Sequence, residues 1–188
     1  QLLSGDISQA QTNITVALAE FALAVKQMED SHPYLQTIAA RLPILKNKIN
    51  SQKALIIAGQ NITLGNELLL GTINKIQNSS STLLKNIEII NNDLSLALPY
   101  YDDGLKNINS ADVNILPTDY QDKFLKFQKM YATFVSDLNN INNSADAIKI
   151  ALGGQGVRRY LLVFQNENEI RPTGGFIGSY ALLEIKNG

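Results

Sequence analysis

A polar loop near the end of the sequence carries the residues with the most evident chemistry. Arg171 is followed by Thr173, Gly174 and Gly175. An arginine guanidinium offers five donors in a planar fork that matches a phosphate or a carboxylate. A neighbouring threonine hydroxyl and the amides of two glycines can form a concave nest for the same anion. The spacing therefore predicts an anion-binding loop.

Two further polar residues, Asn166 and Glu169, precede the arginine and complete this candidate site. A second interpretation stays open for the same residues. Arg171 could pair with Glu169 or with a buried carboxylate, while the glycines only allow the chain to bend.

The segments on either side of this loop have the pattern of β-strands. Residues 159–164 form a continuous apolar run, as expected for a strand that neighbours bury on both faces. Residues 176–185 form a second strand, which ends in the turn Asn187-Gly188. An isolated hairpin is marginally stable at best in water. We therefore expect residues 153–188 to be the start of an α/β domain that continues past Gly188.

The sequence before residue 153 predicts long helices. Residues 3–28 carry apolar side chains at alternating steps of four and three, which is a heptad pattern. The segment Ser31-His32-Pro33 is expected to interrupt this helix, because proline is tolerated best in a first turn. A second helical segment, residues 35–76, is either one helix with a kink at Pro43 or two helices separated near residues 58–65.

Two more helices follow a turn at residues 78–81, where one of the serines is expected to be the N-cap. The third helix should end near Asp103-Gly104, and the fourth should run from an N-cap at Thr118 to Gly153-Gly154. The predicted fold is therefore mainly α, with an elongated antiparallel four-helix bundle over residues 1–152. The heptads could instead mark an intermolecular coiled coil, but short connections favour packing within one chain.

The fourth helix carries a stripe of aromatic residues that could line a ligand pocket. Their heptad spacing instead favours packing in the core: Tyr120, Phe124, Phe127, Tyr131 and Phe134. Three lysines flank the stripe and are expected to form a solvated face: Lys123, Lys126 and Lys129.

Composition excludes several classes of function. The net charge is −1, so the basic patch expected of a nucleic-acid-binding protein is absent and no nucleic-acid partner is predicted. The chain has no cysteine, which excludes disulfides, thiolate catalysis and a zinc site built on sulfur. The one histidine, His32, precedes a proline and is expected to bind no metal. No cofactor is predicted.

The motif Gln165-Asn166, then Glu169-x-Arg171-Pro172-Thr173-Gly174-Gly175-Phe176, resembles a family signature. It is similar to the segment that opens the conserved part of an uncharacterised bacterial family, domain-of-unknown-function family 4012. The preceding helices agree with that family only in type. The resemblance implies a membrane-anchored envelope protein on the extracytoplasmic side of the bacterial cell membrane. It also implies a helical region between the motif and a membrane helix upstream of Gln1.

More distantly, the strand, arginine loop and strand resemble the start of the LytR-CpsA-Psr fold. Enzymes of that family transfer glycopolymers from a polyprenyl-pyrophosphate carrier to the cell wall and clamp the pyrophosphate with arginines. Their aspartate after the loop arginine is replaced here by Pro172-Thr173-Gly174.

Three functions follow from these observations, and no catalytic set is complete within the chain. The first is a helical stalk that presents an envelope α/β domain. The second is a part of an enzyme that handles a phosphorylated envelope glycan or lipid carrier, with Arg171 as its anion clamp. The third is a four-helix sensor that binds small ligands between its helices.

Overall fold

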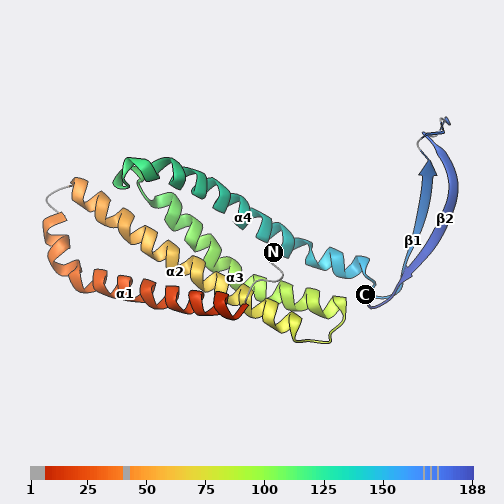
Figure 1. Ribbon diagram of the computed structural model, residues 1–188, viewed down its shortest axis with the longest axis horizontal. Helices are drawn as coiled ribbons and strands as arrows, with labels where there is room; N and C mark the ends of the chain where they lie inside the picture. Colours follow the sequence, from red (N-terminus) through yellow and green to blue (C-terminus); the bar gives the residue numbers. More distant parts are fainter. Residues whose placement is uncertain (1–6, 40–42, 167, 170, 173) are drawn as a thin grey trace. The chain divides into compact units, whose positions relative to one another are not determined.

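The computed structural model describes residues 7–39, 43–166, 168–169, 171–172 and 174–188, with the backbone alone for residues 31–39 and 43–44. Four long antiparallel helices are followed by a two-stranded antiparallel sheet (Figure 1). The predicted fold class, mainly α with two strands at the end, is confirmed. The elements are α1 (Ile7–Ala39), α2 (Pro43–Gln77), α3 (Leu83–Ser110), a 3-10 turn η1 (Val113–Ile115), α4 (Thr118–Ala151), β1 (Arg158–Asn166) and β2 (Phe176–Ile185).

The chain divides into two compact units. The first comprises residues 1–79 and 89–142, and the second comprises residues 80–88 and 143–188. The first unit holds the helical core. The second unit groups the start of α3 and the end of α4 with the hairpin, while the predicted domain boundary between residues 152 and 153 stays a prediction.

The first helix does not end where the sequence pattern predicted. Its backbone continues through Ser31-His32-Pro33 to Ala39, so the predicted interruption is wrong. The second helix instead begins at Pro43, where the missing proline N–H has no intrahelical partner to lose. The preference of proline for a first helical turn holds in this chain, but it applies to Pro43 and not to Pro33.

Helix α2 is continuous from Pro43 to Gln77, so no break occurs near residues 58–65, but residues 35–39 belong to α1 and the predicted single helix over residues 35–76 is wrong in its first part. The glycines in this region allow close approach of aromatic rings. A Cβ on Gly59 would overlap the ring of Phe21, and a Cβ on Gly65 would lie 2.8 Å from a ring carbon of Tyr101. Glycine at these two positions therefore lets α2 approach the rings of Phe21 and Tyr101.

Helix α3 differs from its prediction at both ends. Its N-cap is Thr82, whose Oγ1 accepts a hydrogen bond from the Lys85 N–H at 3.3 Å, and not one of the serines. The helix also continues past Gly104 to Ser110. A Cβ on Gly104 would lie 2.9 Å from the hydroxyl of Tyr131, so this glycine gives α4 room to approach.

The core of the first unit lies between α2, α3 and α4. It is built from alanines, β-branched aliphatic residues and tyrosines that are at least 94% buried: Ala58, Ala97, Tyr101, Ile108, Tyr131 and Val135. Tyr101 packs edge-on against Phe134, with ring centroids 5.4 Å apart and an interplanar angle of 86°. Its hydroxyl donates to Asn66 Oδ1 at 2.8 Å, and its carbonyl accepts from the Tyr131 hydroxyl at 3.1 Å. The tyrosines therefore bury their rings without leaving a hydroxyl unpaired.

A polar cluster links α2 to α3 beside this core. Asp93 Oδ2 accepts from Lys75 Nζ at 2.8 Å and from the buried Thr72 hydroxyl at 2.9 Å. Burial raises the pKa of Asp93, but the hydrogen bonds from Lys75 and Thr72 and the lysine charge outweigh it and hold that pKa below its usual value. The folded chain therefore prefers the ionised carboxylate.

We expect ionisation of the Asp93 carboxyl to make the free energy of unfolding depend on pH in the acid range. A carboxyl whose pKa is depressed by folding contributes its full stability above its unfolded pKa of about 4 and loses it as pH falls through the folded value. Asp93→Asn should therefore lower the free energy of unfolding at pH 7 by about 1 to 2 kcal/mol. Urea denaturation of both proteins at pH 7 and pH 3 checks this. A difference between variant and wild type that is as large at pH 3 as at pH 7 would contradict it.

Candidate functional site

The predicted anion loop connects β1 to β2 as the turn of a hairpin. The strands pair antiparallel from Arg158 opposite Ile185 to Asn166 opposite Phe176. The register shifts between Phe164, which faces Ser179, and Gln165, which faces Ile177, so Gly178 is the extra residue of a bulge. The bulge and the loop lie at the same end of the hairpin.

Asn166 organises the first half of the loop. Its Oδ1 accepts from the Asn168 N–H at 3.1 Å, and its carbonyl accepts from the Glu169 N–H at 3.4 Å. This is the usual way in which asparagine side chains replace a backbone partner in turns. The side chain therefore shapes the loop.

The two glycines have separate roles in the second half. Gly174 has φ of 101°, a region that favours glycine, and its N–H donates to the Arg171 carbonyl at 2.9 Å. A Cβ on Gly175 would lie 2.7 Å from the Asn166 carbonyl oxygen and from Gln165 Nε2. One amide of the predicted nest is thus occupied within the loop. Thr173, the remaining member of the predicted site, lies outside the described residues.

The Arg171 guanidinium lies between a carboxylate and an aromatic ring. Its Nη2 is 3.7 Å from Glu169 Oε2, and its central carbon is 5.3 Å from the ring centroid of Phe176. The side chains of Arg171 and Glu169 are 56% and 51% exposed, so solvent screens this pair. The structure thus contains the pairing that the second interpretation proposed. A long, exposed ion pair of this kind leaves the guanidinium accessible to another anion.

The opposite end of the hairpin holds the end of α4, and sequence reasoning did not find this contact. Gly153 has φ of 75°, as its predicted role as C-cap requires. Gly153 donates to the Ile150 carbonyl and Gly154 to the Lys149 carbonyl, which is the bond pattern of a Schellman motif. The glycine pair was therefore identified correctly as the end of the helix.

Both strands then supply donors to the last carbonyls of α4. Arg158 Nε donates to the Ile150 carbonyl at 3.1 Å, and the Tyr160 hydroxyl donates to that of Ala151. After the end of β2, the Gly188 N–H donates at 2.9 Å to the carbonyl of Leu152, the residue that follows α4. These carbonyls have no partner within a helix, so the hairpin caps α4 with side chains and backbone together. A basic residue and a tyrosine shortly after the glycine pair were the sequence signal for this joint.

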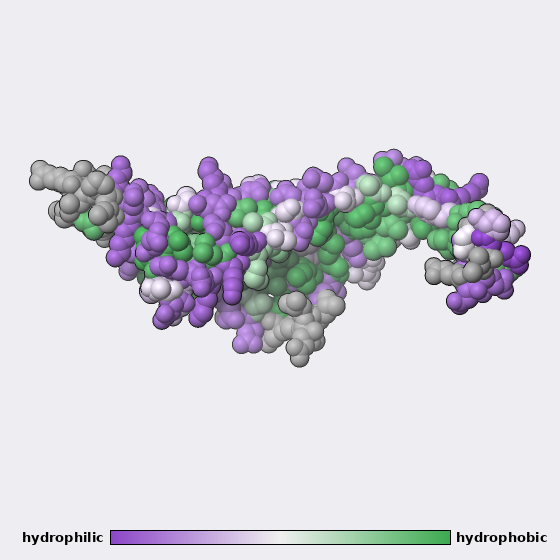
Figure 2. All heavy atoms as spheres, turned by 90° about the horizontal axis from the view of Figure 1, so that it is seen from above, coloured by the Kyte–Doolittle hydropathy of each residue, from purple (hydrophilic) through white to green (hydrophobic). Residues whose placement is uncertain are grey.

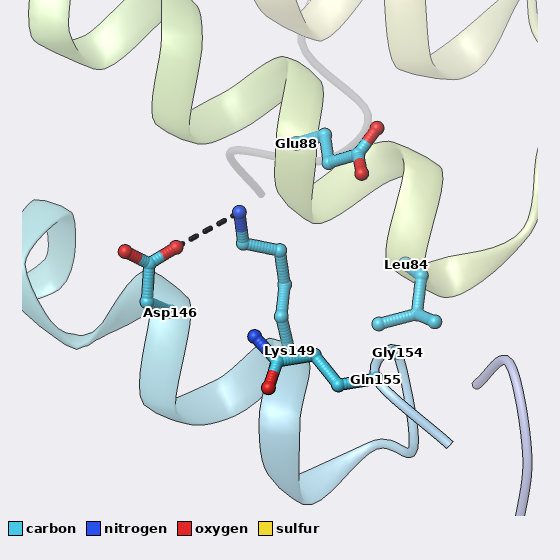
Figure 3. Close-up of a pocket in the computed structure, with 6 residues that line it drawn as sticks. All are labelled: Leu84, Glu88, Asp146, Lys149, Gly154 and Gln155. Carbon is cyan, nitrogen blue, oxygen red and sulfur yellow. Dashed lines mark ion pairs between the residues drawn. The ribbon is translucent and has the colours of Figure 1, made fainter.

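An open pocket lies beside this joint, within the second unit (Figure 3). It is lined by Leu84, Glu88, Asp146, Lys149, Gly154 and Gln155. Lys149 Nζ is 2.9 Å from Asp146 Oδ1, and this hydrogen bond raises the pKa of the lysine, with burial opposing it and the charge of Glu88 adding to it. The volume of about 230 Å³ is below the roughly 300 Å³ at which ligand pockets begin. The positive charge of Lys149 is balanced by carboxylates of the same unit.

Both faces of the hairpin are apolar and exposed, so the prediction that β1 is buried on both faces is not met. On one face the cross-strand pairs are Leu161 with Leu182 and Val163 with Tyr180, with exposures from 47% to 76%. The Arg159–Glu184 ion pair, 2.9 Å long, ends this face. The other face exposes Leu162, Phe164 and Leu183. Each of the two strands has a single neighbouring strand among the described residues, and the side chains named on both faces are exposed.

The chemistry that these residues support is anion binding. Among the described residues no three His, Cys, Asp or Glu side chains gather as a metal ion would need. No helix in the described ranges combines the length and apolar character needed to cross a membrane. Neither of these two findings identifies a catalytic residue in the loop.

Comparison with known proteins identifies the segment that carries the loop. The family model described as "Protein of unknown function (DUF4012)" matches residues 155–188, which confirms the resemblance predicted from the motif. No curated protein and no solved structure matches the chain. The more distant likeness to the LytR-CpsA-Psr fold therefore stays a prediction.

Proposed function

Starting from the match of residues 155–188 to this family, we propose that the chain belongs to a membrane-anchored, extracytoplasmic envelope protein. In this proposal the helices form a stalk, and the hairpin is the first part of an α/β domain that the stalk presents. The observation that carries it is the joint between α4 and the hairpin. Donors from Arg158, Tyr160 and Gly188 hold three consecutive carbonyls at the end of the helix.

The exposed faces of the hairpin support the presence of a larger sheet domain. Strands that are apolar on both faces are typical of sheets with a layer packed on each side. Leu161 and Leu182 on one face and Phe164 on the other are more than half exposed. We propose that further elements of the same domain cover both faces in the complete protein. An aqueous hairpin with these faces would otherwise be marginally stable.

The ligand class that fits the loop is a phosphorylated envelope glycan or lipid carrier. A phosphate with two free oxygens can accept two parallel N–H bonds from Arg171, which the single contact with Glu169 at 3.7 Å does not provide. The ring of Phe176 lies 5.3 Å from the guanidinium carbon and attracts the cation through its π-face. Binding of the anion would then replace the pairing with Glu169.

Arg171→Ala in the full-length protein is expected to weaken binding of polyprenyl pyrophosphate at least tenfold, about 1.4 kcal/mol. Isothermal titration calorimetry measures this, and inorganic pyrophosphate in a parallel titration separates recognition of the headgroup from that of the lipid. Arg159→Ala is the matched control, because Arg159 is also an exposed hairpin arginine paired with a glutamate. Equal affinity of the Arg171 variant and the wild type would reject the anion site.

The location has its own test, which does not depend on the ligand. Protease added to intact spheroplasts should degrade the helical region of the full-length protein, with a cytosolic protein as the protected control. Recovery of the full-length protein in the cytosolic fraction would reject the proposal of an anchored extracytoplasmic stalk.

A further inference from the structure

Three of the five aromatic residues of the stripe on α4 are exposed, contrary to the prediction that all of it is core. Tyr131 is buried, and Phe124 packs partly against the core. A second row, however, is 40% to 58% exposed: Tyr120, Phe127, Phe134 and Ile141. Hydrophobic side chains reach the surface between hydrophilic ones in the space-filling view (Figure 2). Helix α4 therefore has an inner apolar row and an outer one.

The outer row has the spacing of a surface that packs against another helix. Its four members follow each other at intervals of seven residues, and an apolar repeat of seven is the pattern of left-handed helix pairs. Met130 lies on the same side of the helix and is 71% exposed. From Tyr120 to Ile141 the row extends over about 32 Å of helix. Scattered surface hydrophobics need no explanation, but a regular row of this length does.

The row is symmetric about its own centre. Reversing the direction of α4 about a point beside Met130 places Tyr120 opposite Ile141 and Phe127 opposite Phe134. The same reversal places Lys123 opposite Leu138, one residue from Asp137. Two identical helices in antiparallel orientation would thus match large apolar residues with each other along the whole row.

The charges at the border of the row are complementary in that arrangement. Lys123 and Asp137 are both exposed, and neither forms an ion pair with another residue in the described parts of the chain. Lys123 instead lies over the ring of Tyr120, with its Nζ 5.2 Å from the centroid. Because Lys123 and Asp137 lie within one residue of symmetric positions, the long lysine side chains could form two ion pairs between two copies. Such flanking pairs set the partner and the orientation of paired helices.

We propose that a second copy of this chain covers the outer row of α4, as an antiparallel α4–α4′ pair with its two-fold axis beside Met130. An interface of this kind is isologous, because the same patch serves both partners. The surface of one chain contains both the apolar row and its complementary charges. This pairing is independent of the Arg171 loop and of its ligand.

Sedimentation velocity of the 188-residue chain tests the pairing. We expect a dimer whose population depends on concentration, and Met130→Lys should raise its dissociation constant at least about tenfold, because it places two like charges at the axis. Leu125→Lys is the matched control, since Leu125 is 41% exposed on α4 but lies away from the outer row. A wild-type monomer at 100 µM and above, on the order of weak dimer affinities, would overturn the proposal.

Charge reversal gives a second, independent readout. Lys123→Asp should weaken the dimer by placing two acidic residues opposite each other, and adding Asp137→Lys to it should restore the wild-type affinity. The natural chain has no cysteine, so Met130→Cys also reports the axis by forming a disulfide-linked dimer under oxidation, which Leu125→Cys should not form. A dimer that tolerates Met130→Lys unchanged, for example one formed through the hairpin faces, would also overturn the proposal.

Discussion

Tyr101→Ala is expected to lower the free energy of unfolding of the helical unit by about 3 to 5 kcal/mol, as large-to-small substitutions of buried aromatics do. The side chain of Tyr101 is fully buried, and its ring packs against Tyr131 and Phe134. The substitution would leave a cavity between helices and remove the donor to Asn66. Burial, with a further contribution from Tyr131, also raises the pKa of Tyr101 far above its usual value, so the hydroxyl remains a donor at any ordinary pH.

Two variants separate the contributions to this effect. Tyr101→Phe keeps the ring and loses only the hydrogen bond, so we expect a loss of about 1 kcal/mol. Tyr100→Ala removes the neighbouring tyrosine, which is 38% exposed, and should cost well below the loss at Tyr101. Urea denaturation followed by circular dichroism measures all three. A loss at Tyr100 equal to that at Tyr101 would show that the ring of Tyr101 is not the centre of the core.

Gly65→Ala should also destabilise the helical unit, by about 1 to 3 kcal/mol, although alanine is the better helix former. A Cβ at this position would lie 2.8 to 2.9 Å from three atoms of the Tyr101 ring. The ring is fully buried and already packs against Tyr131 and Phe134, so moving it would disturb these contacts. The clash therefore outweighs the gain of about 1 kcal/mol in helix propensity.

Gly71 lies in the same helix and provides a control of opposite sign. A Cβ there would meet no atom within 4 Å, so Gly71→Ala should stabilise the protein by up to about 1 kcal/mol. The two substitutions make the same chemical change six residues apart. Thermal unfolding of both variants should give shifts of opposite direction, and a stabilising shift at Gly65 would contradict the close packing of α2 on Tyr101.

The joint at the end of α4 bears on how the hairpin could serve any of the three functions considered. Tyr160 and Arg158 lie at the start of β1, and the loop with Arg171 lies at its far end. A hairpin whose base is hydrogen-bonded to a helix end holds its loop in a defined direction relative to that helix end. This arrangement favours the interpretation that α4 presents the loop, whether Arg171 binds an envelope phosphate or pairs with Glu169.

The elements themselves could be predicted from the sequence, because they depend on local patterns. The heptads predicted four helices, the glycine pair at residues 153–154 predicted the end of α4, and the apolar runs predicted both strands. The motif around Arg171 predicted the family match over residues 155–188. The helix limits at Pro33 and Gly104 were wrong, and at Gly104 the helix continues because the glycine leaves room for the hydroxyl of Tyr131.

Only the tertiary structure decided which apolar face of each element is covered by other elements. Tyr131 and Phe134 belong to one aromatic stripe, yet one is 6% exposed and the other 40%, because the helices that pack on α4 cover only one flank of it. In the same way, the donors that cap α4 come from residues brought together by the hairpin register. Periodicity determines that a face is apolar. What covers that face depends on the arrangement of several elements in space, and a one-dimensional pattern does not contain that information.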